Sequence, residues 1–154
     1  MKLMLGIDDA GRGPLIGPMI LSGVLVTKEQ ENYLKKKGTT DSKLLLHPQR
    51  VELSKLIEAN SLHFYAVKSS PEEIDDSINS GTNLNTLEAK KAAEIINTIN
   101  KGKLRKEKIT VIVDCPSNNI LAWKNKLMNL IKYKDNLEIK CEHKADLNHT
   151  AVSA

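Results

Sequence analysis

The stretch GIDDAGRGPLIGPM, residues 6–19, decides the fold and the candidate site of this sequence. It places two adjacent carboxylates, Asp8 and Asp9, at the end of an apolar run and then turns through glycines and prolines. The flanking apolar runs, residues 2–8 and 18–26, are short and favour strands, so they predict two antiparallel strands joined by a loop. Neighbouring carboxylates repel each other, so their position at a strand end indicates a bound ligand.

The composition is that of one globular domain. The chain has 154 residues, of which 40% are hydrophobic and 27% charged, and this length is enough to bury a core. The start of the chain does not resemble a signal peptide, and no apolar run approaches the ~20 residues of a membrane span. We therefore expect a cytoplasmic protein without a membrane partner. In that compartment Cys115 and Cys141 are expected to be buried free thiols, with a bridge between them the less favoured alternative.

Charge is distributed unevenly along the chain. Residues 1–100 carry 12 Lys and Arg against 13 Asp and Glu, whereas residues 101–154 carry 11 against 6. A basic carboxyl-terminal segment beside a cluster of acids favours a polyanionic ligand, with metal ions bound by the acids. A solvated lysine-rich surface is the alternative that charge alone leaves open.

Hydrophobic periodicity predicts the remaining elements. Asn85 is expected to cap the fourth helix and Ser117 the fifth, and Trp123 is expected to lie in the core. The predicted further strands are residues 62–68, 108–114 and 137–142. The predicted helices are residues 29–38, 47–60, 71–80, 85–102 and 117–133.

This order of elements predicts an α/β fold with a mixed five-stranded sheet flanked by helices. Asp8 and Asp9 are expected to end the first strand and Asp114 the fourth, and Asp146 follows the fifth. Because the carboxyl ends of parallel strands share one edge of a sheet, the four acids are expected to gather there. Such a cluster suits Mg²⁺ or Mn²⁺, and two ions could act on a phosphodiester. For a lone Asp, a turn or helix cap is the plainer interpretation.

The glycines of the opening stretch also suggest a dinucleotide-binding loop. However, the third glycine, Gly17, comes one residue late, and Pro14 and Pro18 are a poor start for the helix that would receive a pyrophosphate. We therefore set this alternative aside.

Five segments in order resemble the type 2 ribonucleases H, in particular archaeal ribonuclease HII. The opening stretch resembles the family signature GIDEAGRGP followed by GPM. The resemblance runs from Lys2 to Ala154. The four later segments are TTDSKLL (39–45), NLNTLEA (83–89), VIVDCP (111–116) and EHKADLNHTAVSA (142–154).

The resemblance implies a ribonuclease H-like catalytic domain over residues 1–154. It also implies an endonuclease that cleaves the RNA strand of RNA/DNA hybrids and nicks DNA 5′ of an embedded ribonucleotide, leaving a 3′-hydroxyl and a 5′-phosphate. The expected cofactor is Mg²⁺ or Mn²⁺, with two ions bound, and no obligate protein partner is indicated. The implied catalytic and metal-binding acids are Asp8, Asp9, Asp114 and Asp146.

The same resemblance implies where substrate binds. The glycine loop would sense the ribose 2′-hydroxyl mainly through backbone groups, which can approach a sugar closely only where no Cβ intervenes. Two further segments would lie near substrate phosphates, although a solvated lysine is an equal alternative at position 144. The implied substrate contacts are Gly11, Arg12, Gly13, Ser42, Lys43 and Lys144.

Two departures from the family pattern affect these expectations. Position 9 is Asp where the family usually has Glu, and the shorter reach predicts a slower site that favours Mn²⁺. We also expect this chain to lack the family's carboxyl-terminal helical region, which holds a tyrosine that packs on the ribose. The alternative function is therefore a hybrid-binding or incomplete, weakly active form.

Overall fold

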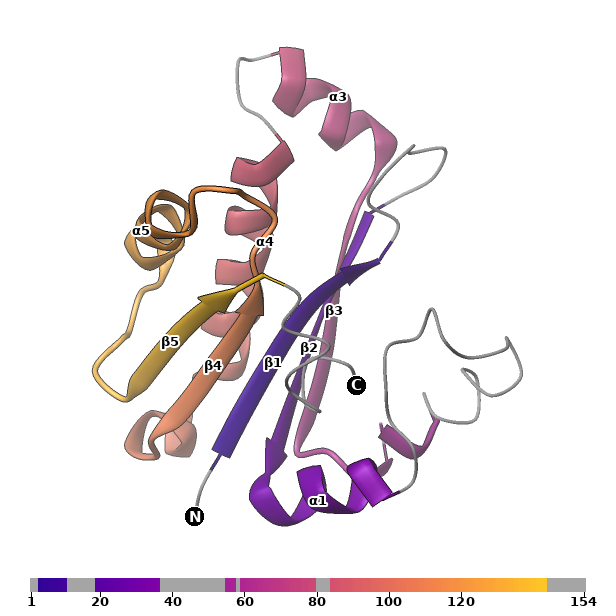
Figure 1. Cartoon of the computed structure of the whole chain (residues 1–154), viewed down its shortest axis with the longest axis vertical. Helices are drawn as coiled ribbons and strands as arrows, with labels where there is room; N and C mark the ends of the chain where they lie inside the picture. The colour runs from indigo at the N-terminus through magenta and orange to yellow at the C-terminus, as the bar shows by residue number, and fades with distance from the viewer. Residues whose placement is uncertain (1–2, 11–18, 37–54, 58, 80–83, 144–154) are drawn as a thin grey trace.

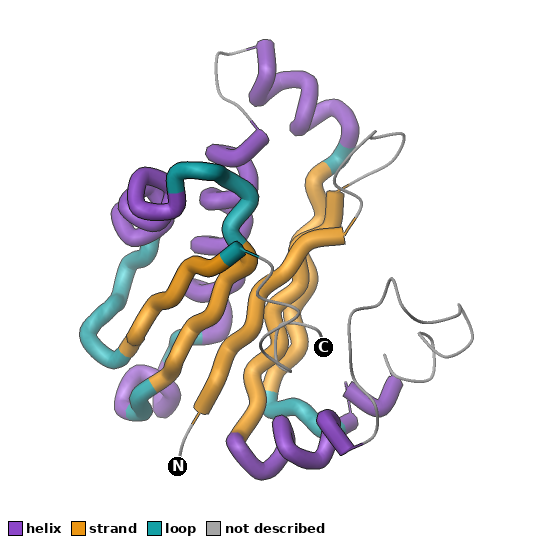
Figure 2. The backbone as a smooth tube through the Cα atoms, viewed as in Figure 1, coloured by secondary structure: helices purple, strands orange, loops and turns teal. Residues whose placement is uncertain are grey.

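The computed structural model describes residues 3–10, 19–36, 55–57, 59–79 and 84–143. Within these residues five strands form one sheet in the order β3-β2-β1-β4-β5, as Figures 1 and 2 show. The five predicted strands are therefore confirmed. They are β1 (Leu3–Ala10), β2 (Met19–Thr27), β3 (His63–Ser69), β4 (Ile109–Asp114) and β5 (Leu137–Glu142).

The sheet is mixed, as predicted. β1 pairs antiparallel with β2, and β2 pairs antiparallel with β3. β1 pairs parallel with β4, which pairs parallel with β5. Four strands thus run in one direction and only β2 runs in the other. The carboxyl ends of β1, β4 and β5 consequently lie at one edge of the sheet.

The α-helices agree with the predicted segments over the described residues, whereas the short 3-10 helix at Gly102–Lys106 was not predicted. Residues 55–57 are helical within the predicted segment 47–60, most of which lies outside the described residues. In the described part of the chain, no helix has both the length and the apolar character needed to cross a membrane. The other helices are α1 (Lys28–Lys36), α3 (Pro71–Asn79), α4 (Leu84–Ile99), the 3-10 helix η2 (Gly102–Lys106) and α5 (Ile120–Leu130).

One face of the sheet packs against α4 and α5. Alternate strand residues such as Leu5 and Val111 join the small and branched side chains of α4, including Ala92 and Ile96, in one buried cluster. Trp123 of α5 is 3% exposed in the same cluster, so its predicted core position is confirmed. β4 is largely apolar because it has apolar contacts on both faces: Val111 and its neighbours pack under the helices, and Ile112 packs against Met4 on the opposite face.

The opposite face of the sheet has a smaller apolar cluster. Val24 and Val26 of β2 pack with Ile57, and Met4 of β1 and Leu56 lie partly buried against them. The strand residues between the core positions therefore face this second side. Asp8 belongs to this alternate set, two residues beyond Gly6 and four beyond Met4.

Two predicted helix caps are wrong. α4 begins at Leu84, so Asn85 lies inside the first turn, where its carbonyl accepts a 2.8 Å hydrogen bond from the indole of Trp123. α5 is capped by Asn119, whose side chain accepts from the Ala122 backbone at 3.1 Å. Ser117 instead accepts from the Asn119 backbone and shapes the turn before the helix.

The connections that follow α4 and α5 are joined by a pair of asparagines. The side-chain amide nitrogen of Asn136 lies 3.0 Å from Oδ1 of Asn100, 3.0 Å from the Leu104 carbonyl and 2.8 Å from the Glu107 carbonyl. Asn100 is 4% exposed and returns a 3.1 Å bond to Oδ1 of Asn136. This network fixes η2 against the turn that leads into β5.

Candidate functional site

The parallel pairing of β1 with β4 brings two predicted site residues together. Ile7 pairs with Val113 in this ladder, and the next residue of each strand is an aspartate, Asp8 in β1 and Asp114 in β4. Asp114 ends its strand as predicted, whereas β1 continues past Asp8 to Ala10. The two aspartates are therefore neighbours across adjacent strands, with backbones about 5 Å apart.

Side-chain alternation decides which face of the sheet carries these acids. Ile7 and Val113 are 0% and 2% exposed and belong to the core beneath α4 and α5. Because successive strand residues point to opposite faces, Asp8 and Asp114 project from the other face. Both are partly exposed, so a solvent-borne ligand can reach them.

Two residues that sequence reasoning missed lie in the same row across the sheet. Asp8 pairs with Ser22 of β2, and Asp114 pairs with Glu142 of β5. Paired residues share a face of the sheet, so four neighbouring strands present Ser22, Asp8, Asp114 and Glu142 side by side. We call these four residues, three carboxylates and one serine, the carboxylate row. Their grouping depends on the strand order and register, which local sequence patterns do not show.

A further carboxylate approaches the end of β4 from the helix face. Glu88 of α4 is 2% exposed. Its charge acts on Cys115, the residue after Asp114: burial raises the pKa of the Cys115 thiol, a hydrogen bond to the Ser117 backbone lowers it, and the charges of Asp114 and Glu88 raise it further. Negative charge is thus concentrated at the end of β4 on both faces of the sheet.

The two cysteines are free thiols, as expected, but burial is confirmed for Cys115 alone, because Cys141 is partly exposed. Burial raises the pKa of Cys141 to about 12, with a smaller effect from Cys115 and an opposing one from Lys124. Since the thiolate is the nucleophilic form, these raised pKa values leave both cysteines unsuited to nucleophilic catalysis at neutral pH.

His143 has a structural contact at the end of β5. Its Nε2 lies 2.6 Å from the carbonyl oxygen of Ser117, which joins the end of β5 to the loop after β4. The Cys115 backbone N–H also donates to the Glu142 carbonyl at 2.8 Å. These two bonds extend the β4–β5 pairing past Asp114 and fix the edge of the sheet that carries the acids.

The other predicted site residues are not placed by the structure. The backbone of Asp9 in β1 pairs with that of Leu21 in β2, and the side chain of Asp9 lies outside what is described. Among the described residues, no group of three or more His, Cys, Asp or Glu side chains could hold a metal ion. The predicted residues outside the described part are Gly11, Arg12, Gly13, Ser42, Lys43, Lys144 and Asp146.

The chemistry of the described acids fits a hard divalent cation. Asp8 and Asp114 offer carboxylate oxygens, which are the ligands that Mg²⁺ and Mn²⁺ prefer. The described cysteines near them, Cys115 and Cys141, have raised pKa values that disfavour the thiolate a softer metal would need. Neighbouring carboxylates repel each other, and a bound cation relieves such repulsion.

A family model for ribonuclease HII matches residues 5–154. The chain belongs to the ribonuclease HII family. It is 37% identical over 158 aligned residues to a ribonuclease HII of Methanocaldococcus jannaschii, and the match covers 99% of this chain and 68% of that protein. The chain therefore spans about two thirds of the length of this relative.

Solved structures of the family share the fold. A ribonuclease HII from Archaeoglobus fulgidus, solved in complex with PCNA, has a TM-score of 0.81 and 29% identity, and the match covers 98% of this chain and 67% of that one. A Bst ribonuclease HIII in complex with Mn²⁺ has a TM-score of 0.71 at 15% identity, over 99% of this chain and 49% of that one, which shows a common fold. The ribonuclease H-like architecture expected from the sequence is thus confirmed.

Proposed function

We propose that this chain is a metal-dependent endonuclease that hydrolyses the RNA strand of RNA/DNA hybrids and nicks DNA 5′ of an embedded ribonucleotide. The products would carry a 3′-hydroxyl and a 5′-phosphate. The observation that supports this proposal most strongly is the parallel register that puts Asp8 next to Asp114 at the carboxyl edge of the sheet. Membership of the ribonuclease HII family gives the reaction class.

The four acids Asp8, Asp9, Asp114 and Asp146 would hold two ions of Mg²⁺ or Mn²⁺. When bound, such ions supply positive charge that offsets the charge developing on the phosphodiester in an in-line displacement. The rigid pairing of β1 with β4 would keep Asp8 and Asp114 at a fixed separation, so little reorganisation is needed when the ions and the phosphate arrive.

Substrate selection would come from the segments around this edge. The backbone of Gly11, Arg12 and Gly13 would test for the ribose 2′-hydroxyl, which distinguishes RNA from DNA. Ser42, Lys43 and Lys144 would contact the phosphates, the lysines as point charges. Acting in the cytoplasm, such an enzyme would serve ribonucleotide removal during DNA replication and repair.

Asp9 stands where the family signature has Glu, which motivates a specific expectation for the metal preference. Its carboxylate is one methylene shorter, and Mg²⁺ tolerates poor geometry less well than Mn²⁺ does. Asp9→Glu is therefore expected to raise the Mg²⁺-supported cleavage rate more than the Mn²⁺-supported rate. Equal rates before and after the change, with both ions, would show that the shorter side chain has no effect.

The proposal is tested with labelled duplex DNA that contains one ribonucleotide and with a uniform RNA/DNA hybrid. Each is incubated with the chain in Mg²⁺, Mn²⁺ or EDTA. We expect cleavage that needs the metal and falls by about 10²- to 10³-fold in Asp114→Asn, an order of magnitude typical for losing a group that acts on the transition state. Glu138→Gln is the matched control, because Glu138 is an exposed acid of β5 lower on the same face, and it should cleave like wild type.

Two results would contradict the proposal in different ways. Metal-dependent binding without cleavage of either substrate, from a folded protein, would favour the hybrid-binding or weakly active form. Cleavage that survives in Asp114→Asn would remove the acids of β1 and β4 from the reaction. Cleavage of the hybrid alone would restrict the function to hybrids.

A further inference from the structure

Basic side chains gather at one end of the helix layer, away from the carboxylate row. Two connections meet there, residues 101–108 after α4 and residues 131–136 after α5, and we call these two segments the basic end. They carry seven Lys and Arg against one Glu and one Asp, a net charge of +5 in a chain whose total is +4. All seven basic residues are exposed. The excess positive charge of the chain is thus concentrated in this one region.

The basic end is held in a defined shape. The amide of Asn136 binds the carbonyls of Leu104 and Glu107, which joins the two segments directly. The guanidinium of Arg105 lies 4.7 Å from the centre of the Tyr133 ring, a cation–π contact between the same two segments. A charged surface fixed in this way loses little conformational entropy when it binds a partner.

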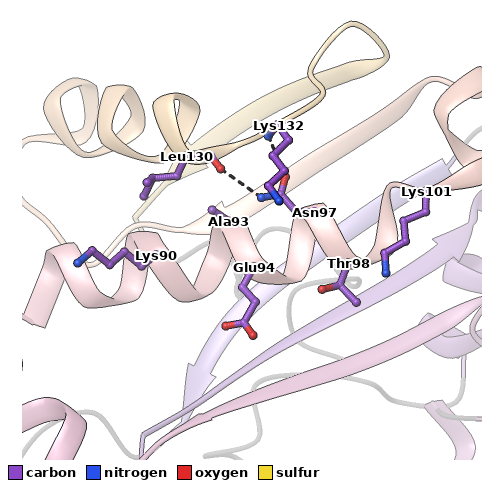
Figure 3. A pocket seen from close by; sticks show the side chains of 8 residues that line it. All are labelled: Lys90, Ala93, Glu94, Asn97, Thr98, Lys101, Leu130 and Lys132. Carbon is purple, nitrogen blue, oxygen red and sulfur yellow. Dashed lines mark hydrogen bonds between the residues drawn. The ribbon is translucent and has the colours of Figure 1, made fainter.

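A surface hollow of about 420 Å³ extends the basic end along α4 (Figure 3). Lys101 and Lys132 of the basic end line it together with Lys90, against a single acid, Glu94. Asn97 fixes its shape, because its side chain donates to the Leu130 carbonyl at 3.1 Å and accepts from the Lys132 backbone at 2.9 Å. The other lining residues are Ala93, Thr98 and Leu130.

The arrangement of the charges indicates the class of partner. The lysines are distributed over two segments and along one helix and do not converge on a single point, which suits a ligand with repeated, spaced negative charge. The phosphate backbone of nucleic acid has this form, and lysines bind it as point charges without reading its sequence. Only one of the chain's five aromatic residues, Tyr133, lies in the basic end, so stacking on bases has little part in such binding.

The position of the basic end sets the scale of the contact. β4 starts at Ile109, beside the basic end, and finishes at Asp114 in the carboxylate row. At ~3.3 Å per residue these two positions are about 17 Å apart. The carboxylate row projects from the face of the sheet opposite α4 and α5, so the path between the two sites is longer than this separation. At ~3.4 Å per base pair, a duplex that contacts both sites therefore spans more than about five base pairs.

We propose that the basic end binds the phosphate backbone of the nucleic-acid substrate, more than about five base pairs from the bond that the carboxylate row faces. This inference rests on the proposed function for the identity of the duplex. The basic end would add affinity that is independent of sequence and sensitive to salt, and it would leave the chemistry at the acids unchanged.

The test measures binding of the 154-residue chain to a fluorescent RNA/DNA hybrid in EDTA, by anisotropy, at a series of salt concentrations. Lys103→Gln combined with Lys132→Gln removes two charges of the basic end. Lys36→Gln combined with Lys55→Gln removes two exposed charges outside it, and is the matched control. We expect the slope of log K against log salt to fall by about two in the first variant and to stay unchanged in the second. The Kd at 0.1 M salt should rise at least tenfold in the first variant only.

Equal slopes for wild type and the Lys103/Lys132 variant would overturn the proposal, as would an equal loss in the control variant. Neither readout requires cleavage, so failure of the proposed nuclease activity and failure of the basic end to bind are separate results. Melting temperatures within about 2 °C of wild type show that both variants remain folded.

Discussion

The asparagine pair that joins the two halves of the basic end gives a prediction of defined size. Replacing Asn136 with alanine removes the amide nitrogen that faces Oδ1 of Asn100 at 3.0 Å and the carbonyls of Leu104 and Glu107 at 3.0 and 2.8 Å. It also removes the oxygen that accepts from Asn100 at 3.1 Å. Asn100 keeps its bond to the Tyr133 carbonyl and loses its reciprocal partner.

The expected cost follows from these contacts. An intramolecular hydrogen bond contributes about 1 kcal/mol net, and a buried polar group left without its partner costs about 1–3 kcal/mol. Asn100 is 4% exposed, so water cannot replace the lost amide freely. We therefore expect Asn136→Ala to lower the free energy of unfolding by about 3 kcal/mol, a large part of the 5–15 kcal/mol that is typical of a domain.

Urea denaturation followed by circular dichroism measures this loss. The matched control is Asn125→Ala, because Asn125 is an exposed asparagine of α5, and its replacement should change stability by less than about 0.5 kcal/mol. A loss below about 1 kcal/mol for Asn136→Ala, with an unchanged dependence on urea, would refute the reasoning that this network fixes η2 to the turn before β5.

Three further predictions concern packing, pH and thiol chemistry. A Cβ at position 23 would meet Cγ2 of Ile95, so Gly23→Ala should force α4 away from the sheet. We expect this change to lower the free energy of unfolding by about 1–3 kcal/mol, as measured by urea denaturation. No loss of stability would mean that the Ile95 side chain moves freely. Hydrogen bonds from the Lys91 ammonium, at 2.9 Å, and then from the Ser70 backbone lower the pKa of Glu73 from 4.5. The ionised Glu73 therefore stabilises the fold above pH 4.5, and this stabilisation is lost as the pH falls through the folded-state pKa. On acidification the free energy of unfolding of wild type should fall by a few tenths of a kcal/mol more than that of Glu73→Gln. Equal losses in the two proteins would argue against the ion pair. Because partial burial raises the pKa of Cys141 to about 12, iodoacetamide at pH 8 should label it slowly in the native protein and rapidly in urea, as read by mass spectrometry. Equally fast labelling in both states would contradict the effect of its surroundings on the thiol.

The strands and the main helices could be predicted from sequence because their signals are local. The apolar run of β4 and the helical spacing of Trp123 and Leu127 need no knowledge of the rest of the chain, and both are buried as predicted. The caps of α4 and α5 were predicted less well. Ser117 and Asn119 are both good capping residues two positions apart, and the choice between them depends on how the chain leaves β4.

The candidate site could be predicted only in part, for a different physical reason. Asp8 and Asp114 lie near the carboxyl ends of two strands that the order of elements predicts to be parallel. Their position at the same edge of the sheet could therefore be predicted from sequence. Ser22 and Glu142 join them through pairing register, a relation between residues on different strands that no local pattern contains. The Asn100–Asn136 bond likewise joins residues 36 positions apart. Such contacts follow from the assembled sheet and helix layer.

The proposed function requires Asp8 and Asp114 to act together on a divalent cation, and Mn²⁺ binding measured by electron paramagnetic resonance tests this most directly. The signal of free Mn²⁺ is followed as the chain, its Asp8→Asn and Asp114→Asn variants and the Glu138→Gln control are added. We expect wild type and the control to bind Mn²⁺, and each aspartate variant to bind it with an affinity at least about tenfold weaker. Binding of Mn²⁺ by Asp114→Asn as tight as that by wild type would contradict this requirement.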